Sequence, residues 1–196
     1  MADEFYRYTG RQATICPFIS TLMAPLQRNR EVRLYDFLYV ASGEPHKNHE
    51  NLIEAWKILA SDSIRPSLAL TIDEGKDAAL WNRLADVIRE WDLNIVNHSD
   101  QSNVEKLYQS SGALIYPSTF ESLGLPLLEA REFNLPVIAA ELDFVRDSID
   151  PEQTFDPASP RSIARAVKRF LGYGDPRPAI VSSQEFLKTV RDLHSR

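Results

Sequence analysis

One segment of the chain combines two carboxylates with a predicted turn from a strand into a helix. It runs from Pro117 to Ala130 and places Glu121 and Glu129 eight residues apart, with Gly124 and Pro126 between them. Proline is favoured in the first turn of a helix, so we expect a helix to begin here. The first N–H groups of a helix have no partner within it and can bind an anion. Carboxylates beside that anion can accept hydrogen bonds from hydroxyl groups, and the pattern therefore suits a nucleotide-sugar.

The two acids have different expected places in this turn. Glu129 is predicted one turn inside the helix, where side chains lean toward the N-terminus, so it could accept hydrogen bonds from a ribose diol. Glu121 lies in the loop, nearer a reacting sugar. The alternative is that both acids only offset the helix dipole, which is worth about 0.3–1 kcal/mol for each. The glycine and proline between them favour a binding role.

A second polar loop, residues 42–49, follows the first predicted strand. Gly43 permits an unusual backbone angle or the close approach of a ligand. Lys47 is expected where the next helix begins, and there it could neutralise a phosphate as a point cation. The alternative is an ordinary solvated lysine. His46 and His49 are three residues apart, but no third metal ligand is evident near them, so we interpret them as a solvated pair and predict no metal.

Short apolar runs alternate with segments of helical periodicity along most of the chain. Strands are predicted at residues 37–41, 68–72, 93–96, 113–116 and 136–140, with a short edge strand at 153–155, and helices at 51–59, 77–91, 103–110, 126–133, 162–171 and 178–193. This alternation is typical of an α/β fold, a Rossmann-like doubly wound parallel sheet with helices on both faces. In such a sheet the carboxyl ends of the strands share one edge, so we expect the loops 42–49, 97–101 and 117–125 to form one pocket.

The length and composition indicate one globular domain with short appendages. The chain has 196 residues and a net charge of −6, with no basic stripe, so we expect no nucleic-acid partner. No apolar run approaches the length of a membrane span, the first residues lack a signal-peptide pattern, and the single cysteine, Cys16, cannot form an internal disulfide. We therefore predict a cytoplasmic location. We divide the chain into a lead-in or linker at 1–34, the α/β domain at 35–175 and a C-terminal helix at 176–196.

Several sequence fingerprints of other enzyme classes are absent. The chain has no Gly-x-Gly-x-x-Gly, no Gly-Lys-Ser/Thr phosphate loop, no Gly-x-Ser-x-Gly elbow and no Asp-x-Asp. Dinucleotide-binding, P-loop, serine hydrolase and metal-held diphosphate chemistries therefore lack their motifs.

Residues 37–171 resemble the C-terminal, donor-binding half of a GT-B retaining glycosyltransferase, in family 4 (glycosyl transferases group 1). The matching motifs are Tyr39-Val40-Ala41, His46-Lys47-Asn48, Leu107-Tyr108, Ala113 to Ser118, Glu121 to Pro126, Glu129-Ala130, Leu135 to Ala139 and Phe155-Asp156-Pro157. Glu121 and Glu129 meet the family's Glu-x7-Glu motif. The match is specific because a Pro-Ser pair precedes the motif and Gly-Leu-Pro lies inside it.

The resemblance implies a role for each site residue. Lys47 and Glu121 would be catalytic: Lys47 would hold and stabilise the leaving diphosphate, and Glu121 would hold the transferred sugar. Glu129 would bind the ribose hydroxyls, and Asn97 and His98 would lie near the base. The other donor-binding residues implied are Ser42, Gly43, Ser118, Phe120, Gly124, Leu125 and Pro126. A nucleotide-diphospho-sugar would be the co-substrate, transfer would retain the anomeric configuration, and no metal or other cofactor would be required.

The sequence departs from the family pattern in two places. The family often has an arginine five residues before the lysine, where this chain has Ser42. A GT-B enzyme also has an N-terminal acceptor domain, for which residues 1–34 are too few. The expected partners are thus the donor, the missing N-terminal domain and an acceptor glycan or glycolipid of polysaccharide biosynthesis, with peripheral membrane attachment through the absent domain. The chain alone is expected to bind donor weakly and to transfer little sugar. The alternatives are a non-catalytic nucleotide-sugar-binding module and a GT-B epimerase-like enzyme.

Overall fold

Six parallel strands form a single sheet in the computed structural model, which describes residues 2–12, 33–100, 103–174 and 182–194. The strands are β1 (Tyr35–Tyr39), β2 (Leu68–Leu70), β3 (Ile95–Asn97), β4 (Ser111–Tyr116), β5 (Val137–Ala140) and β6 (Gln153–Phe155). Their order across the sheet is β3-β2-β1-β4-β5-β6, and every neighbouring pair is parallel. This confirms the predicted doubly wound α/β fold.

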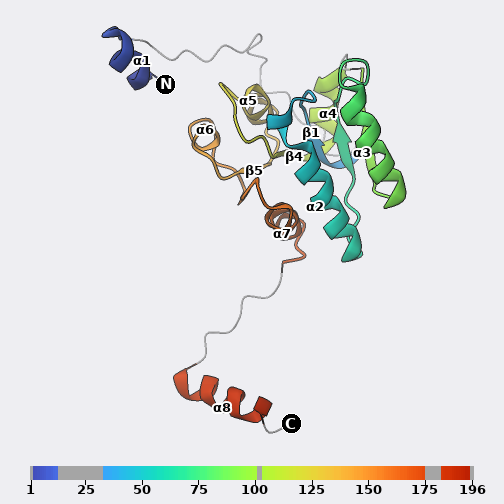
Figure 1. Cartoon of the computed structure of the whole chain (residues 1–196), viewed down its shortest axis with the longest axis vertical. Coiled ribbons are helices and arrows are strands. Elements are labelled where there is room, and N and C mark those ends of the chain that lie inside the picture. Colours follow the sequence, from blue (N-terminus) through green and yellow to red (C-terminus); the bar gives the residue numbers. More distant parts are fainter. Residues whose placement is uncertain (1, 13–32, 101–102, 175–181, 195–196) are drawn as a thin grey trace.

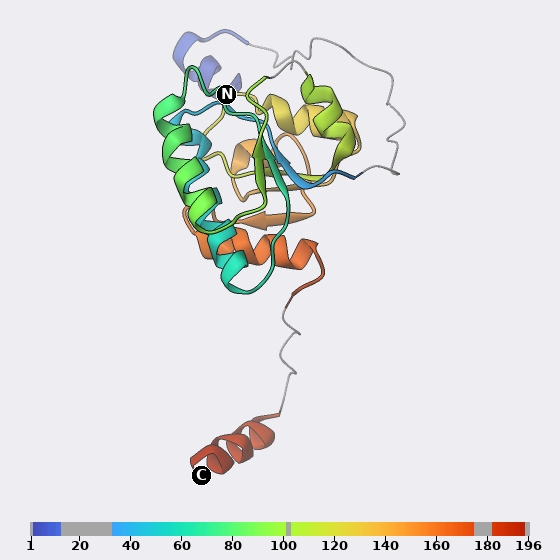
Figure 2. The same cartoon turned by 90° about the vertical axis from the view of Figure 1, so that its right-hand side faces the viewer.

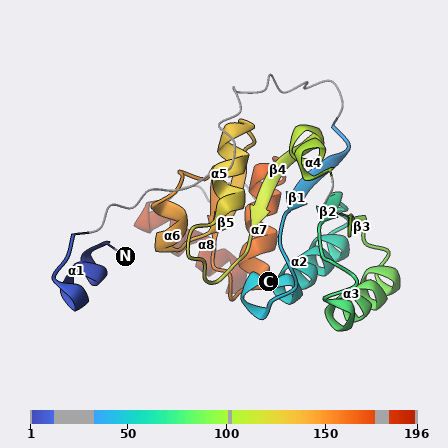
Figure 3. The same cartoon turned by 90° about the horizontal axis from the view of Figure 1, so that it is seen from above.

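Helices cover both faces of the sheet. They are α2 (His49–Ser61), α3 (Ala78–Glu90), α4 (Val104–Ser110), α5 (Leu125–Glu132), the single turn α6 (Asp143–Arg146) and α7 (Pro160–Phe170). Helix α2 packs between α3 and α7 on one face, and α4 and α5 lie on the other (Figures 1, 2 and 3). Two further helices, α1 (Ala2–Thr9) and α8 (Ser183–His194), lie near the ends of the chain.

The central strands are buried on both faces, which explains their continuous apolar sequences. All six residues of β4 are buried, and Leu114 pairs with Leu38 of β1 on one side and Val137 of β5 on the other. Trp56 fixes α2 to this layer: its ring packs edge-on against Phe37 at 5.7 Å, and its Nε1 donates to a backbone carbonyl at 2.9 Å. The middle of the sheet is thus the rigid support of the loops at its carboxyl edge.

Two helices were not predicted from the sequence. The interpretation of residues 1–34 as an extended lead-in is wrong for Ala2–Thr9, which form α1. Helix α6 was also missed, and both helices are too short for a reliable periodic signal. Residues 13–32, which include Cys16, lie outside the described residues, as do 176–181 and 195–196 of the predicted C-terminal segment. No helix of the described part is long and apolar enough to cross a membrane.

The packing of β4 generates a stability prediction. Leu114→Ala removes a fully buried side chain from the middle of the sheet and should lower the free energy of unfolding by about 3 kcal/mol. Leu34→Ala is the matched control, because that leucine is 62% exposed and its loss should change stability by less than about 0.5 kcal/mol. Urea denaturation followed by circular dichroism measures both values, and equal losses in the two variants would contradict the described core.

Candidate functional site

The strand order places two of the predicted loops side by side. The chain leaves β1 toward β2 and β3 and then returns to β4, so β1 and β4 are neighbours at the switch point where ligands bind in such sheets. Thr119 donates its backbone N–H to the His46 carbonyl at 2.8 Å. The Asn48 side chain donates to the carbonyls of Pro117, at 3.1 Å, and Pro157, at 2.8 Å. The loops after β1 and β4 therefore form one continuous surface.

Lys47 and Glu121 form an ion pair across these two loops. Lys47 ends a short 3-10 helix, η1 (Pro45–Lys47), and its Nζ lies 2.7 Å from Oε1 of Glu121. The side chains are only 16% and 11% exposed, so their attraction is screened less than that of a surface pair. In this state each charge is balanced by the other. An anion that binds Lys47 therefore competes with the Glu121 carboxylate for the ammonium group.

Buried hydroxyl groups lie beneath this ion pair. The Tyr39 hydroxyl donates to the Lys47 carbonyl at 2.7 Å and lies 3.0 Å from Oγ of Ser118. Burial raises the pKa of Tyr39 and of Tyr116 far above the usual range, and for Tyr116 the nearby charge of Glu121 raises it further. Both phenols therefore remain neutral. Ser118 is fully buried, so its side chain supports the site from below, and its contact with a donor stays a prediction.

Helix α5 begins a few residues after Glu121 of this ion pair, and the backbone N–H groups of its first turn bear on anion binding. Gly124 precedes the helix with a φ of 64°, a left-handed conformation that favours glycine, and Pro126 lies in the first turn as predicted. Among the described residues no acceptor for the Leu125 amide is found, so this N–H can meet an anion. Leu125 and Phe120 are exposed, the latter by 71%. The surface formed by Lys47, Glu121 and the start of α5, here called the mouth, is therefore open to solvent.

Glu129 lies one turn into α5 and is half-buried. Its Oε2 accepts a hydrogen bond of 2.7 Å from the hydroxyl of Tyr108, whose ring stacks on Phe133. Burial, followed by the charge of Glu129, raises the pKa of Tyr108 well above its usual range, so the hydroxyl keeps its proton. Within the described residues we find no hydrogen bond to the second carboxylate oxygen. Tyr108 belongs to a motif of the family resemblance, but its sequence position predicts no role for it.

Gly43 is a glycine for a reason that differs from the expected one. Its φ is not positive, and a Cβ at this position would lie 2.3 Å from Cγ of Asp77. The Gly43 N–H donates to Oδ2 of Asp77 at 2.9 Å. A carboxylate of the chain itself therefore makes the close approach that we had predicted for a ligand. Ser42 donates its hydroxyl to Glu44, which lowers the pKa of that acid.

The third predicted loop lies apart from the other two. Asn97 and His98 are at the end of β3, which β2 separates from β1. The Asn97 amide pairs with the backbone N–H and C=O of Ile72 at 2.9 and 3.0 Å and also donates to Glu74 at 2.9 Å. Nε2 of His98 lies 2.9 Å from the Tyr35 hydroxyl. Both side chains thus make contacts within the protein, and the placement of a base near them stays a prediction.

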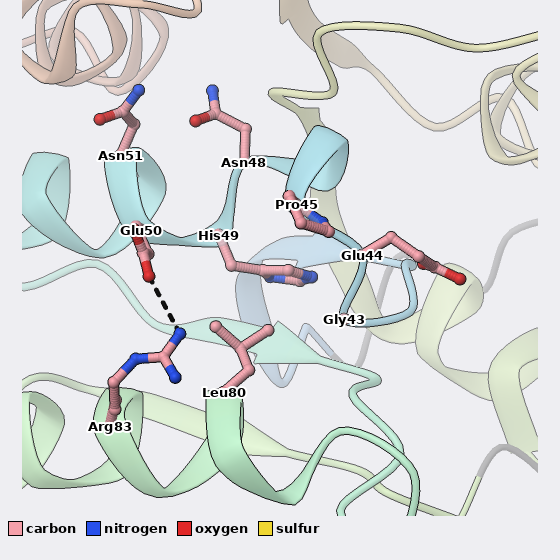
Figure 4. A pocket seen from close by; sticks show the side chains of 9 residues that line it. All are labelled: Gly43, Glu44, Pro45, Asn48, His49, Glu50, Asn51, Leu80 and Arg83. Atoms are coloured by element: carbon pink, nitrogen blue, oxygen red, sulfur yellow. Dashed lines mark hydrogen bonds and ion pairs between the residues drawn. The ribbon is translucent and has the colours of Figure 1, made fainter.

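His49 contradicts the interpretation of a solvated histidine pair. It is 3% exposed, its Nε2 donates to the Ser42 carbonyl at 2.8 Å, and its Nδ1 has no hydrogen-bond partner among the described residues. It lines a cavity of about 230 Å³ between α2 and α3, across which Glu50 and Arg83 form an ion pair at 3.1 Å (Figure 4). Burial lowers the pKa of His49, so its ring is neutral at pH 7.

Comparison with known proteins gives a consistent family match. A family described as "Glycosyl transferases group 1" matches residues 27–181. O-antigen chain mannosyltransferase B of Escherichia coli is 30% identical over 107 residues, which cover 54% of this chain and 28% of that protein. Serotype-specific mannosyltransferase WbdA of Escherichia coli is 32% identical over 144 residues, which cover 69% and 17%. The chain thus spans less than a third of these two relatives.

Solved structures share the fold at low sequence identity. The C-terminal domain of a glycosyl transferase group 1 family protein (LpcC) from Francisella tularensis has a TM-score of 0.60 and 18% identity, and the match covers 72% of this chain and 77% of that one. Anabaena Alr3699/HepE in complex with UDP and glucose has a TM-score of 0.58 and 17% identity, with 70% and 39% covered.

The burial of His49 generates a pH prediction. The folded pKa lies below the unfolded value of about 6.5, so the unfolded chain binds the proton first as the pH falls. The free energy of unfolding should therefore decrease as the pH is lowered from 7.5 through 6.5, until the folded pKa is reached. His49→Gln should flatten this slope in urea titrations between pH 7.5 and 5.5, whereas His46→Gln should keep it. An unchanged slope in His49→Gln would contradict the argument.

Proposed function

The chain belongs to the glycosyl transferases group 1 family, and we propose that it is the donor-binding domain of a retaining glycosyltransferase. Its ligand is a nucleotide-diphospho-sugar at the carboxyl edge of β1 and β4. The observation that carries the proposal is the Lys47–Glu121 pair beside the uncapped start of α5. These groups supply a cation, the Leu125 backbone amide and a hydroxyl acceptor beside one another.

The diphosphate is the part of the ligand that Lys47 and the start of α5 suit. A lysine and the positive end of a helix both favour negative charge. In transfer, negative charge grows on the diphosphate as its bond to the sugar breaks, and groups already in place stabilise that charge. A second cation would strengthen binding of the diphosphate, but this loop carries Ser42 and Glu44 instead. We therefore expect the nucleotide-sugar to bind weakly. No metal or other cofactor is part of the proposal.

The two glutamates suit the two sugars of such a ligand. When the diphosphate takes Lys47, the Glu121 carboxylate is released and can accept hydrogen bonds from the hydroxyls of the transferred sugar. Among the described residues one carboxylate oxygen of Glu129 has no hydrogen-bond partner and can accept from the ribose hydroxyls. Glu129 lies one turn into α5, whereas Glu121 lies in the loop before it.

The relatives suggest which donors to test first. Two of them are named as mannosyltransferases, and one structural neighbour holds UDP and glucose. GDP-mannose and UDP-glucose are therefore the first probes, with ADP-glucose as the third. We propose that an N-terminal domain and an acceptor glycan or glycolipid complete the reaction.

Donor binding is tested by calorimetry on the chain. We expect at least one of the three nucleotide-sugars to bind, and Lys47→Ala to weaken that binding about tenfold or more through loss of the cation. Lys57→Ala is the control, because Lys57 pairs with Glu54 on α2 away from the mouth and should leave the Kd unchanged. Absence of binding by all three nucleotide-sugars would overturn the proposal in favour of an interaction module.

The ion pair makes a second prediction with an unusual sign. Glu121→Gln removes the internal competitor for Lys47, so the free nucleoside diphosphate should bind about three- to tenfold more tightly than to the wild type. The nucleotide-sugar should gain less, because the same change removes an acceptor for its hydroxyls. Glu54→Gln, which breaks the corresponding pair with Lys57, should change neither value. Equal weakening of both ligands by Glu121→Gln would contradict a competing ion pair.

A further inference from the structure

We infer that Tyr108 is a positioning residue that orients Glu129 toward the ribose of the ligand and so helps to distinguish ribonucleotides from their deoxy counterparts. The inference rests on the proposed function, because it assumes that the mouth between β1 and β4 holds a nucleotide. It adds a residue from α4, an element that contributes nothing else to the site.

The contact itself is short and enclosed. The Tyr108 hydroxyl donates to Oε2 of Glu129 at 2.7 Å, and Tyr108 is 1% exposed. Its ring stacks on Phe133 with a centroid distance of 5.2 Å and an interplanar angle of 1°. Phe133 follows Glu129 by one helical turn. The Tyr108 side chain therefore lies along α5, with its ring on Phe133 and its hydroxyl at Glu129. The hydroxyl therefore has one position available.

A single fixed donor decides how the carboxylate is presented. A glutamate side chain without a partner populates several rotamers, and all but one of them are lost when it accepts a hydrogen bond from a ligand hydroxyl. With Oε2 held by Tyr108, the direction of the other oxygen is set before a ligand arrives. Such preorganisation raises affinity by lowering the cost of ordering the site. The phenol is neutral, so it donates to Glu129 without cancelling the charge that attracts ribose hydroxyls.

The arrangement of the helices explains why this support comes from α4. Helix α4 precedes β4 in the chain and α5 follows β4. The two helices lie on the same face of the sheet (Figure 3). A side chain from α4 can therefore reach α5 without crossing the mouth. A purely structural bond between the two helices would use the same contact, so the test needs a measurement that such a bond would not affect.

The test compares Tyr108→Phe with the wild type by calorimetry. The probes are GDP, UDP and ADP, the 2′-deoxy form of each, and inorganic pyrophosphate, which has no ribose. Loss of a hydrogen bond to a charged group should weaken binding of the preferred ribonucleotide about tenfold. The 2′-deoxy form should lose less, so the discrimination between the two should shrink, and pyrophosphate should bind as before. Equal loss for all probes, or no loss, would overturn the inference.

Two further variants separate positioning from folding. Trp56→Phe also removes a buried donor, whose bond to the Pro66 carbonyl is 2.9 Å, and it should lower stability without changing the ribose discrimination. In a Glu129→Gln background, Tyr108→Phe should have a much smaller effect on the ribonucleotide than it has alone; an undiminished effect would contradict action through Glu129. If the wild type binds none of GDP, UDP and ADP, the proposed function fails and this inference fails with it. If it binds one of them and Tyr108→Phe keeps the ribose discrimination, only the inference fails.

Discussion

Parallel pairing of β1 with β4 is the constraint on which the site depends. The two strands are far apart in the chain, yet Phe37 aligns with Ala113 and Leu38 with Leu114 in the middle of the sheet. The loop after each strand must then leave from the same edge, and the ion pair between Lys47 and Glu121 joins positions 74 residues apart. The pairing is stabilised by burial on both faces, since these strand residues are fully enclosed. The charged pair itself adds little to that stability, because its attraction is offset by the cost of taking two charges out of water.

An ion pair at a proposed ligand site has a consequence for binding. Lys47 and Glu121 balance one another, so the site carries less net charge than its residue types suggest. A ligand with a diphosphate and hydroxyl groups can replace both halves of the pair at once, with the phosphate on Lys47 and a hydroxyl on Glu121. A simple anion can replace only the Glu121 half and leaves that carboxylate partly buried without its cation. The pair thus favours ligands that combine the two chemistries.

The fold and several site residues could be predicted from the sequence, and the contacts among them could not. Continuous apolar runs indicate strands buried on both faces, and the spacing of Glu121, Gly124, Pro126 and Glu129 indicates an open helix start. Asp77 gave no signal, because its bond to Gly43 depends on how α3 packs beside a loop 34 residues away. His49 was misjudged for the same reason: a polar residue in a polar loop is expected in water, but α3 encloses it. Periodicity predicts each element and not the packing between elements.

Buried tyrosines lie beside the charged residues of this site. The Tyr39 hydroxyl donates to the backbone carbonyl of Lys47 and the Tyr108 hydroxyl donates to the Glu129 side chain, while burial, followed by the nearby charge of Glu121, raises the pKa of Tyr116. A lysine or arginine in these places would bind the glutamates more strongly but would cancel the negative charge that the ribose and sugar hydroxyls require. A phenol supplies a directed hydrogen bond with no charge, and its burial raises its pKa so that it remains a donor. The tyrosine rings add the apolar area that fixes them in the core, which joins the orientation of the site to the packing of the sheet.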